Sequence, residues 1–208
     1  MKYTIIAFFL SLFIALVAKS NLVTPEVYGV KFNEIYLCQS ASCDNAVKIG
    51  GGDRIDIADP FFTNSVGSLV DLTNANLGNN VYSHLKFNVD MRILVKANSG
   101  SCWSTPSKIE PGYSAGTNDQ SAYGEQIIQM HTDYVQGDGI TNVTKESFDF
   151  TMALGGTYQK GTGQSIQWNI DVTDSVNFDG CEIGPEEPYL DFSVVPVSYT
   201  HLTLPTKA

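Results

Sequence analysis

The sequence predicts an all-β fold, an antiparallel β-sandwich linked by two disulfides. Three observations support this prediction. Residues 81–96 alternate between apolar and polar side chains, turn-forming residues separate this run from several similar ones, and the body lacks the apolar spacing of an amphipathic helix. A strand that alternates in this way has one apolar and one polar face, and sheets with one polar face are usually antiparallel.

The longest alternating run gives the clearest signal. Its apolar face contains Val81, Ser83, Leu85, Phe87, Val89, Met91, Ile93 and Val95. Because side chains of a strand point alternately to opposite faces, we expect one continuous strand with these residues toward the core.

Shorter runs repeat the pattern at residues 148–154, 166–172 and 190–194. Near the start of the body, Val30 and Phe32 alternate, but Ile35 and Leu37 continue on the opposite parity. One extra residue restores the alternation, so we predict a β-bulge near Asn33 and Glu34.

Segments rich in glycine and proline separate the runs. The sequence GGGD at 50–53, between 47–49 and 55–57, is typical of a hairpin. We expect residues 98–124 to form a long polar connection, and residues 180–188 (GCEIGPEEP) to have no regular structure.

The two ends differ from the body. Residues 1–20 combine Lys2 with a short apolar run and small residues at Ala18 and Ser20, the pattern of a cleaved secretory signal peptide. The alternative is an uncleaved anchor. Residues 197–208 (VSYTHLTLPTKA) resemble translated adapter sequence, so we expect a non-native tail. The β-sandwich domain is then 21–196, in a secreted or periplasmic protein without stable membrane insertion.

The charge of the body excludes one class of partner. Three of the 12 Lys and Arg residues (Lys2, Lys19 and Lys207) lie in the terminal segments, whereas all 22 Asp and Glu residues lie in the body. The body therefore has 9 basic and 22 acidic residues, a net charge of −13. Proteins that bind nucleic acid neutralise phosphates with Lys and Arg, so we expect no nucleic-acid partner.

The four cysteines predict disulfides, because exported proteins use paired cysteines in this way. Three pairings are possible. Cys38 and Cys43 flank a short loop, so we predict that they pair and that Cys102 then pairs with Cys181. The alternative is a zinc site, but the spacing of Cys38 and Cys43 is wider than in the usual zinc motifs.

Aromatic side chains in or near the polar connection predict a binding surface. They are Trp103, Tyr113, Tyr123 and Tyr134. Exposed aromatic rings stack on sugars or anchor protein partners, and coplanar rings would favour a glycan. The alternative is local packing beneath the loop.

Carboxylates gather toward the end of the body, and Asp171, Asp174, Asp179 and Glu182 are the candidate metal ligands. Calcium takes six to eight oxygen ligands, often from loop carboxylates. A structural calcium ion is therefore the one cofactor that the sequence suggests. The alternatives are a solvated acidic surface and a pair of catalytic carboxylates in a glycan-active hydrolase.

Other motifs that could carry chemistry have the wrong context. Gly112 to Gly116 match the G-x-S-x-G pattern of hydrolases, but no strand is expected before Ser114 and no helix after it. His84 and His131 are the histidines of the body, and neither has the spacing of a catalytic triad. We therefore expect no catalytic residues.

Several short motifs resemble uncharacterised exported β-sandwich proteins of marine bacteria. They are YGVK at 28–31, IYLC at 35–38, Ser42-Cys43, IDIA at 55–58, Val66-Gly67, VYSH at 81–84, LGGTY at 154–158 with Gly161, and Cys181. The first half also resembles, more loosely, an uncharacterised domain of envelope lipoproteins, without their lipid-bearing cysteine. The resemblance implies a β-sandwich in the envelope or outside the cell and assigns no activity.

The function that the sequence predicts is therefore a non-catalytic one. We expect a binding or structural domain whose partner is a glycan or a protein of the envelope or the extracellular space. The glycan-active hydrolase remains the alternative.

Overall fold

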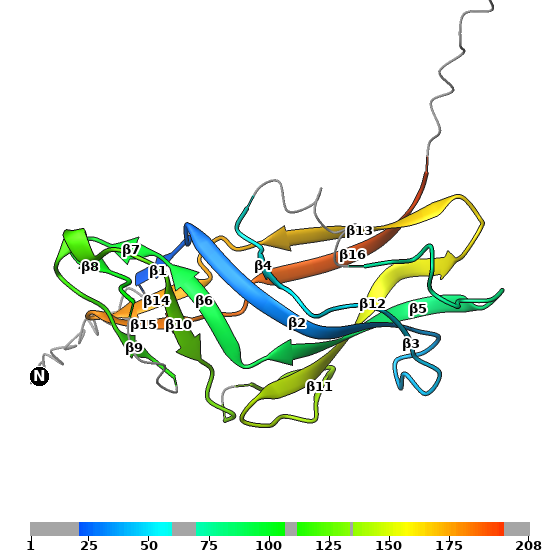
Figure 1. Ribbon diagram of the computed structural model, residues 1–208, viewed down its shortest axis with the longest axis horizontal. Coiled ribbons are helices and arrows are strands. Elements are labelled where there is room, and N and C mark those ends of the chain that lie inside the picture. Colours follow the sequence, from blue (N-terminus) through cyan, green and yellow to red (C-terminus); the bar gives the residue numbers. More distant parts are fainter. Residues whose placement is uncertain (1–20, 60–69, 107–111, 134, 198–208) are drawn as a thin grey trace, which may run out of the picture.

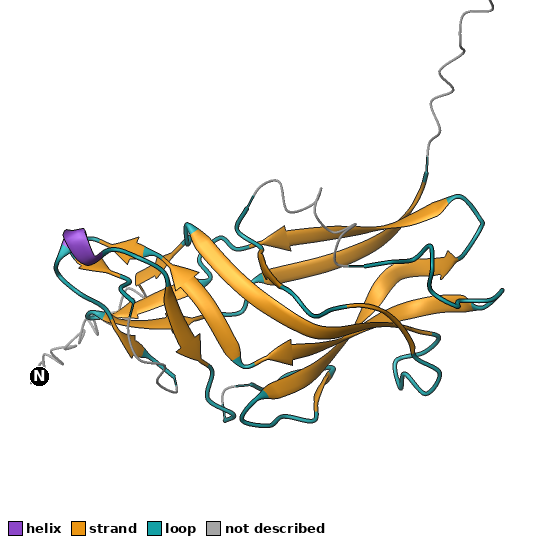
Figure 2. Ribbon diagram, viewed as in Figure 1, coloured by secondary structure: helices purple, strands orange, loops and turns teal. Residues whose placement is uncertain are grey.

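The structure is a computed structural model that describes residues 21–59, 70–106, 112–133 and 135–197. The predicted signal peptide, Tyr134 and all but Val197 of the predicted tail lie outside these residues. The described part is all-β, with one 3₁₀ turn, η1 (Gln120–Ala122) (Figure 2). No helix in the described ranges is long and apolar enough to cross a membrane.

A large curled sheet forms most of the molecule (Figure 1). Its strand order is β10-β6-β2-β5-β12-β11, and β3 and β4 also pair with β2. Every pair in it is antiparallel. The strands are β2 (Val27–Cys38), β3 (Val47–Gly50), β4 (Arg54–Asp56), β5 (Val81–Asp90), β6 (Arg92–Lys96), β10 (Gln126–Gln129), β11 (Ile140–Thr141) and β12 (Ser147–Gln159).

Three smaller sheets complete the fold, in the orders β1-β14-β15-β9, β13-β16 and β7-β8. Figure 1 shows the first of them at one end of the molecule and β13-β16 at the other. Their strands are β1 (Asn21–Val23), β7 (Asn98–Ser99), β8 (Cys102–Trp103), β9 (Ser114–Ala115), β13 (Gln164–Asp171), β14 (Val176–Asp179), β15 (Glu182–Pro185) and β16 (Tyr189–Pro196).

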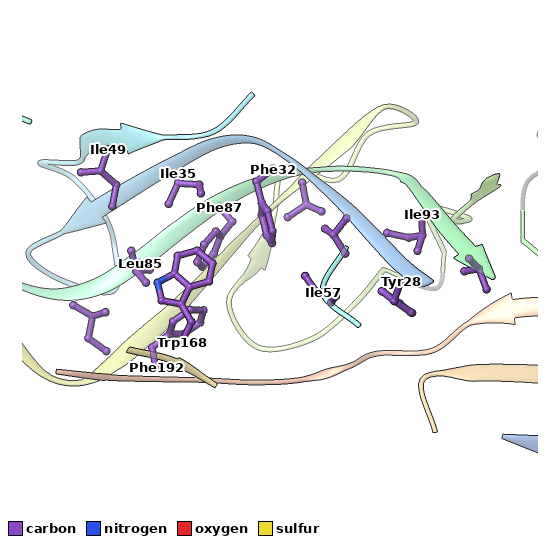
Figure 3. Close-up of a cluster of buried hydrophobic side chains, with 14 of the residues drawn as sticks. Tyr28, Phe32, Ile35, Ile49, Ile57, Leu85, Phe87, Ile93, Trp168 and Phe192 are labelled. Carbon is purple, nitrogen blue, oxygen red and sulfur yellow. The ribbon is translucent and has the colours of Figure 1, made fainter. Parts of the chain in front are cut away.

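One face of the curled sheet, which we call the inner face, packs against the smaller sheets. The ring centroid of Phe87 on β5 lies 5.5 Å from that of Trp168 on β13 and 5.5 Å from that of Phe192 on β16 (Figure 3). The same buried cluster contains Val176, Phe178 and other residues of the four-stranded sheet. The prediction of an antiparallel all-β fold with two disulfides is confirmed, since Cys38 pairs with Cys43 and Cys102 with Cys181.

The predicted bulge is confirmed on β2. The register between β2 and β5 shifts between Phe32 and Glu34, and both Phe32 and Ile35 are buried. Gly51 lies against this bulge with a φ of +106°, and a Cβ there would come within 2.6 Å of the Glu34 Cα. Only glycine combines that backbone conformation with that approach.

The predicted hairpin around residues 50–53 is wrong, although both of its strands exist. β3 and β4 do not pair with each other, because each pairs with a different part of β2. Gly51 and Gly52, both with positive φ, let the chain pass the bulge and continue along the same edge of β2.

The predicted continuous strand over residues 81–96 is wrong in two respects. Met91 separates β5 from β6, although the predicted inward residues from Leu85 to Val95 are indeed buried. At the beginning of the run the expected faces are exchanged, since Tyr82 is fully buried and Val81 is exposed. The Tyr82 hydroxyl donates to the Leu77 carbonyl, which satisfies its polar atom in the interior.

Residues 180–188 also differ from the prediction. They contain β15, which pairs with β14 on one side and β9 on the other. The polar connection from Asn98 onward likewise contains the short strands β7, β8 and β9.

Candidate functional site

The structure brings two of the four predicted aromatic binding residues together. The ring centroids of Trp103 and Tyr123 lie 5.2 Å apart, with an angle of 67° between the ring planes. The Lys96 ammonium group lies 4.8 Å from the centroid of the Tyr123 ring. The two rings are therefore packed edge to face, and they do not form a coplanar platform.

Polar contacts connect this aromatic pair to the N-terminal side of β2. The Tyr123 hydroxyl donates to the Glu26 carboxylate at 2.9 Å, and Lys96 forms an ion pair with the same carboxylate at 2.7 Å. Burial, together with that hydrogen bond, raises the pKa of Tyr123 to about 12. The hydrogen bonds from Lys96 and Tyr123 lower the pKa of Glu26. The polar groups of Glu26, Lys96 and Tyr123 thus already bond to one another.

Among the described residues, Tyr113 makes no ring contact with that pair. Its ring packs against Gly184 on β15, and its hydroxyl accepts a hydrogen bond from the Asn177 side chain at 3.1 Å. Tyr134 lies outside the described residues. A binding role for these aromatic residues remains a prediction.

The four predicted metal ligands are divided between two turns. Asp171 ends β13 and Asp174 lies in the turn to β14, where the Asp171 carboxylate accepts the Thr173 N–H. Asp179 and Glu182 face each other at the opposite end of β14, in its hairpin with β15. No group of three or more His, Cys, Asp or Glu residues in the described segments could hold a metal ion.

The G-x-S-x-G motif has a structural role in this fold. Ser114 lies in β9 and is buried, and its hydroxyl accepts a hydrogen bond from the Gln126 side chain at 2.7 Å. The motif therefore does not present an exposed nucleophile at a strand-to-helix turn.

A site that the sequence did not reveal lies on the other face of the curled sheet, which we call the outer face. It is a groove of about 530 Å³, within the usual range for ligand sites. We call it the outer groove. It is lined by Lys31, Asn33, Asp90, Arg92, Gln129, Lys145, Glu146 and Ser147.

The outer groove lies where the curled sheet is irregular. β2 bulges after Phe32, β5 gives way to β6 at Met91, and the turn between β11 and β12 closes the opposite side. Strand pairing places Gln129 beside Arg92 and Ser147 beside Asp90. Bulges are common next to functional sites because they redirect side chains.

Asp90 and Arg92, two residues of the groove lining, form an ion pair. The Arg92 guanidinium donates to both carboxylate oxygens of Asp90, at 2.8 and 2.7 Å. Burial of Asp90 acts to raise its pKa, but these bonds and the Arg92 backbone N–H together lower it. Asp90 is therefore ionised at neutral pH and neutralises one of the cations nearby.

Arg54 adds another cation beside the groove. It lies directly opposite Lys31 in the β2–β4 pair, and its guanidinium crosses β2 to reach the carbonyl oxygens of Gly29 and Arg92, at 3.1 and 2.9 Å. Its path over β2 passes Gly29, where a Cβ would come within 3.4 Å of the Arg54 side chain and 2.8 Å of the Leu94 Cβ. The absence of a Cβ at Gly29 thus allows Leu94 to pack closely against it, whereas the Arg54 side chain lies at ordinary contact distance.

The turn that carries Lys145 is held firmly. The Thr144 hydroxyl accepts the N–H groups of Glu146 and Ser147, and the Thr144 N–H donates to the Ser147 carbonyl. Gln129 donates to the Lys145 carbonyl at 2.9 Å. These bonds fix the backbone that carries Lys145 beside the groove.

Within the part of the chain that the structure describes, two of the groove cations have no acidic partner. Among the described residues, Lys31 and Lys145 form no ion pair. The lining contains three cations and two carboxylates, and Arg54 lies beside it, so the region is positive on balance. In a body with 9 basic and 22 acidic residues, such a concentration of positive charge is unusual.

A second buried carboxylate lies next to the groove. Asp149 accepts hydrogen bonds from Asn88 and Asn142, at 2.8 and 2.6 Å, and forms an ion pair with Lys86. Burial acts to raise the pKa of Asp149, but these contacts together lower it. Asp90 and Asp149 are both held ionised, whereas a glycosidase needs one protonated carboxylic acid at neutral pH.

Comparison of the chain with family models, curated proteins and solved structures found no match. The candidate site is therefore defined by its geometry alone. Sequence reasoning missed it because Lys31, Arg54, Arg92 and Lys145 are far apart along the chain. Only the register between paired strands brings them to one face, and that register cannot be deduced from the spacing of residues along the sequence.

Proposed function

We propose that this chain is an exported, non-catalytic binding domain whose ligand occupies the outer groove. All four cysteines form disulfides, which is typical of proteins in an oxidising compartment such as the periplasm or the extracellular space. The proposed signal peptide agrees with that location.

The observation that carries the proposal is the pair of unpartnered lysines in a preformed groove. Placing Lys31 directly opposite Arg54 costs free energy, because like charges that face each other on paired strands repel. A ligand that interacts with these cations recovers that cost. The buried carboxylates Asp90 and Asp149 are engaged by Arg92 and by Lys86, so the site favours binding over acid–base chemistry.

The test is thermal melting of the oxidised chain against a panel of neutral and acidic oligosaccharides. A ligand at a hundred times its dissociation constant adds about 2.7 kcal/mol to the free energy of unfolding, a shift of about 5–10 °C for this size. We expect Lys145→Gln to reduce the shift and Trp103→Phe to leave it unchanged. We also expect chromatography to recover the ligand intact.

Two results would contradict this function. A shift that Trp103→Phe removes and Lys145→Gln leaves unchanged would place the ligand at the predicted aromatic surface instead. Cleavage of a panel member would establish the glycan-active hydrolase.

A further inference from the structure

We infer that the ligand of the outer groove is an acidic saccharide, a sugar chain that carries carboxylate or sulfate groups. This inference rests on the proposed function and adds the chemical class of the ligand. It follows from the two kinds of polar group that the groove leaves without partners.

The first kind is the cation. Lys31 lies on β2 and Lys145 at the β11–β12 turn, so they bracket the groove from two separate elements. Neither forms an ion pair among the described residues, and Arg92 keeps part of its guanidinium exposed beside them. An anionic group that enters between them gains charge-assisted hydrogen bonds without displacing an existing carboxylate.

The second kind is the neutral acceptor. The Asn33 side-chain amide donates to Asn88, and the Gln129 amide donates to the Lys145 carbonyl, which orients both side chains. In the described structure no group donates to the amide oxygens of Asn33 and Gln129. These oxygens are hydrogen-bond acceptors on half-buried side chains, so a ligand that carries donors such as hydroxyl groups complements them.

A saccharide with acidic substituents supplies both requirements at once. It presents anionic oxygens to the lysines and hydroxyl groups to the two amide oxygens. The lining contains no aromatic or aliphatic side chain, which disfavours a lipid or another apolar ligand. The acidic body repels an extended polyanion such as duplex DNA, because favourable contacts are confined to the groove.

The experiment is isothermal titration of the oxidised chain with two matched pairs of probes. The first pair is oligogalacturonate and its neutral methyl ester, and the second is dextran sulfate oligosaccharide and unsulfated dextran. We expect at least one acidic member to bind and its neutral counterpart to bind at least about tenfold more weakly, since hydrogen bonds to charged groups are the stronger kind. The probe pair whose acidic member binds shows whether the ligand's anionic group is a carboxylate or a sulfate.

Charge-matched variants locate the binding. We expect Lys31→Gln and Lys145→Gln each to weaken binding of the acidic probe by about tenfold or more. Lys48→Gln removes the same charge from an exposed residue outside the groove lining, and we expect it to change binding by less than about twofold. Melting temperatures of all three variants verify that they fold.

The outcomes separate the inference from the proposed function. Equal binding of acidic and neutral probes, weakened by the groove variants, would overturn the acidic saccharide and preserve the groove. Binding of an acidic probe with an affinity that neither Lys31→Gln nor Lys145→Gln changes would overturn both the inference and the proposed function. Failure of every acidic probe to bind would overturn the inference, while a neutral oligosaccharide from the wider panel could still occupy the groove.

Discussion

The two faces of the curled sheet are built from the same strands and have opposite properties. On β5, Leu85, Phe87 and Val89 are at most 5% exposed and lie in the apolar core. Their neighbours Lys86 and Asn88 point to the outer face and take part in the Asp149 network. Successive residues of one strand therefore serve different purposes: the inner ones hold the layers together, and the outer ones provide the polar chemistry.

The largest expected effect is a loss of stability from the inner face. Phe87 contacts the rings of Phe32, Phe150, Trp168 and Phe192. We expect Phe87→Ala to lower the free energy of unfolding by about 3–5 kcal/mol, because it removes buried ring contacts and leaves a cavity. Urea unfolding measures this.

The matched control is Thr151→Ala, an outward-facing, half-buried position on the adjacent strand β12. We expect its effect to stay below about 1 kcal/mol. Similar losses from both variants would contradict the assignment of stability to the inner face.

Acid should destabilise the molecule through the outer face. The pKa values of Asp90 and Asp149 are lower in the folded chain than in the unfolded one. Hydrogen bonds from Arg92 stabilise the Asp90 carboxylate, and hydrogen bonds from Asn88 and Lys86 stabilise the Asp149 carboxylate. Their contribution is present above the unfolded pKa, about 3.9, and disappears as the pH falls through the folded values.

The measurement is urea unfolding at several pH values between neutral and about pH 2.5. We expect the double variant Asp90→Asn/Asp149→Asn to lose less stability over this range than the parent chain. Identical pH dependence of the two proteins would show that these carboxylates do not contribute.

A single substitution in the groove lining should have an intermediate effect. Asp90→Asn removes the charge that Arg92 contacts with two hydrogen bonds, and the Asp90 side chain is only 4% exposed. We expect a loss of about 1–2 kcal/mol in unfolding free energy. The exposed Glu146→Gln is the control, with an expected change below about 0.5 kcal/mol. If the control costs as much as Asp90→Asn, the pair is not what organises the groove.

The smallest expected effect concerns Lys31, which lies opposite Arg54. Lys31→Gln removes a repulsion between like charges, so we expect unfolding free energy to stay within about 0.5 kcal/mol of the parent or to rise slightly. Chemical denaturation of the two proteins side by side tests this. A clear loss of stability would mean that Lys31 has a structural role and would weaken its assignment to a ligand.

The inner face could be predicted from the sequence because alternation is a local signal. The spacing of Leu85, Phe87 and Val89 identified their common face, and the parity change between Phe32 and Ile35 located the bulge. The pairing of β3 and β4 with β2 could not be predicted in the same way. It depends on Gly51 and Gly52 passing the bulge, a tertiary feature that resembles a hairpin turn in sequence.

The outer groove could not be predicted because it depends on register between distant strands. Lys31 and Arg54 are neighbours only through the β2–β4 pair, and Gln129 meets Arg92 only through β10 and β6. The aromatic residues were predicted to form one binding surface because they are close in sequence. Three-dimensional structure separates Tyr113 from Trp103 and Tyr123.

The most direct test of the outer groove as the ligand site is an amide chemical-shift map. Isotope-labelled oxidised chain is titrated with the acidic oligosaccharide that binds in calorimetry. We predict that the perturbed amides cluster around Lys31, Arg92 and Lys145. Perturbations confined to the surroundings of Trp103 and Tyr123, with the groove amides unchanged, would contradict the assignment.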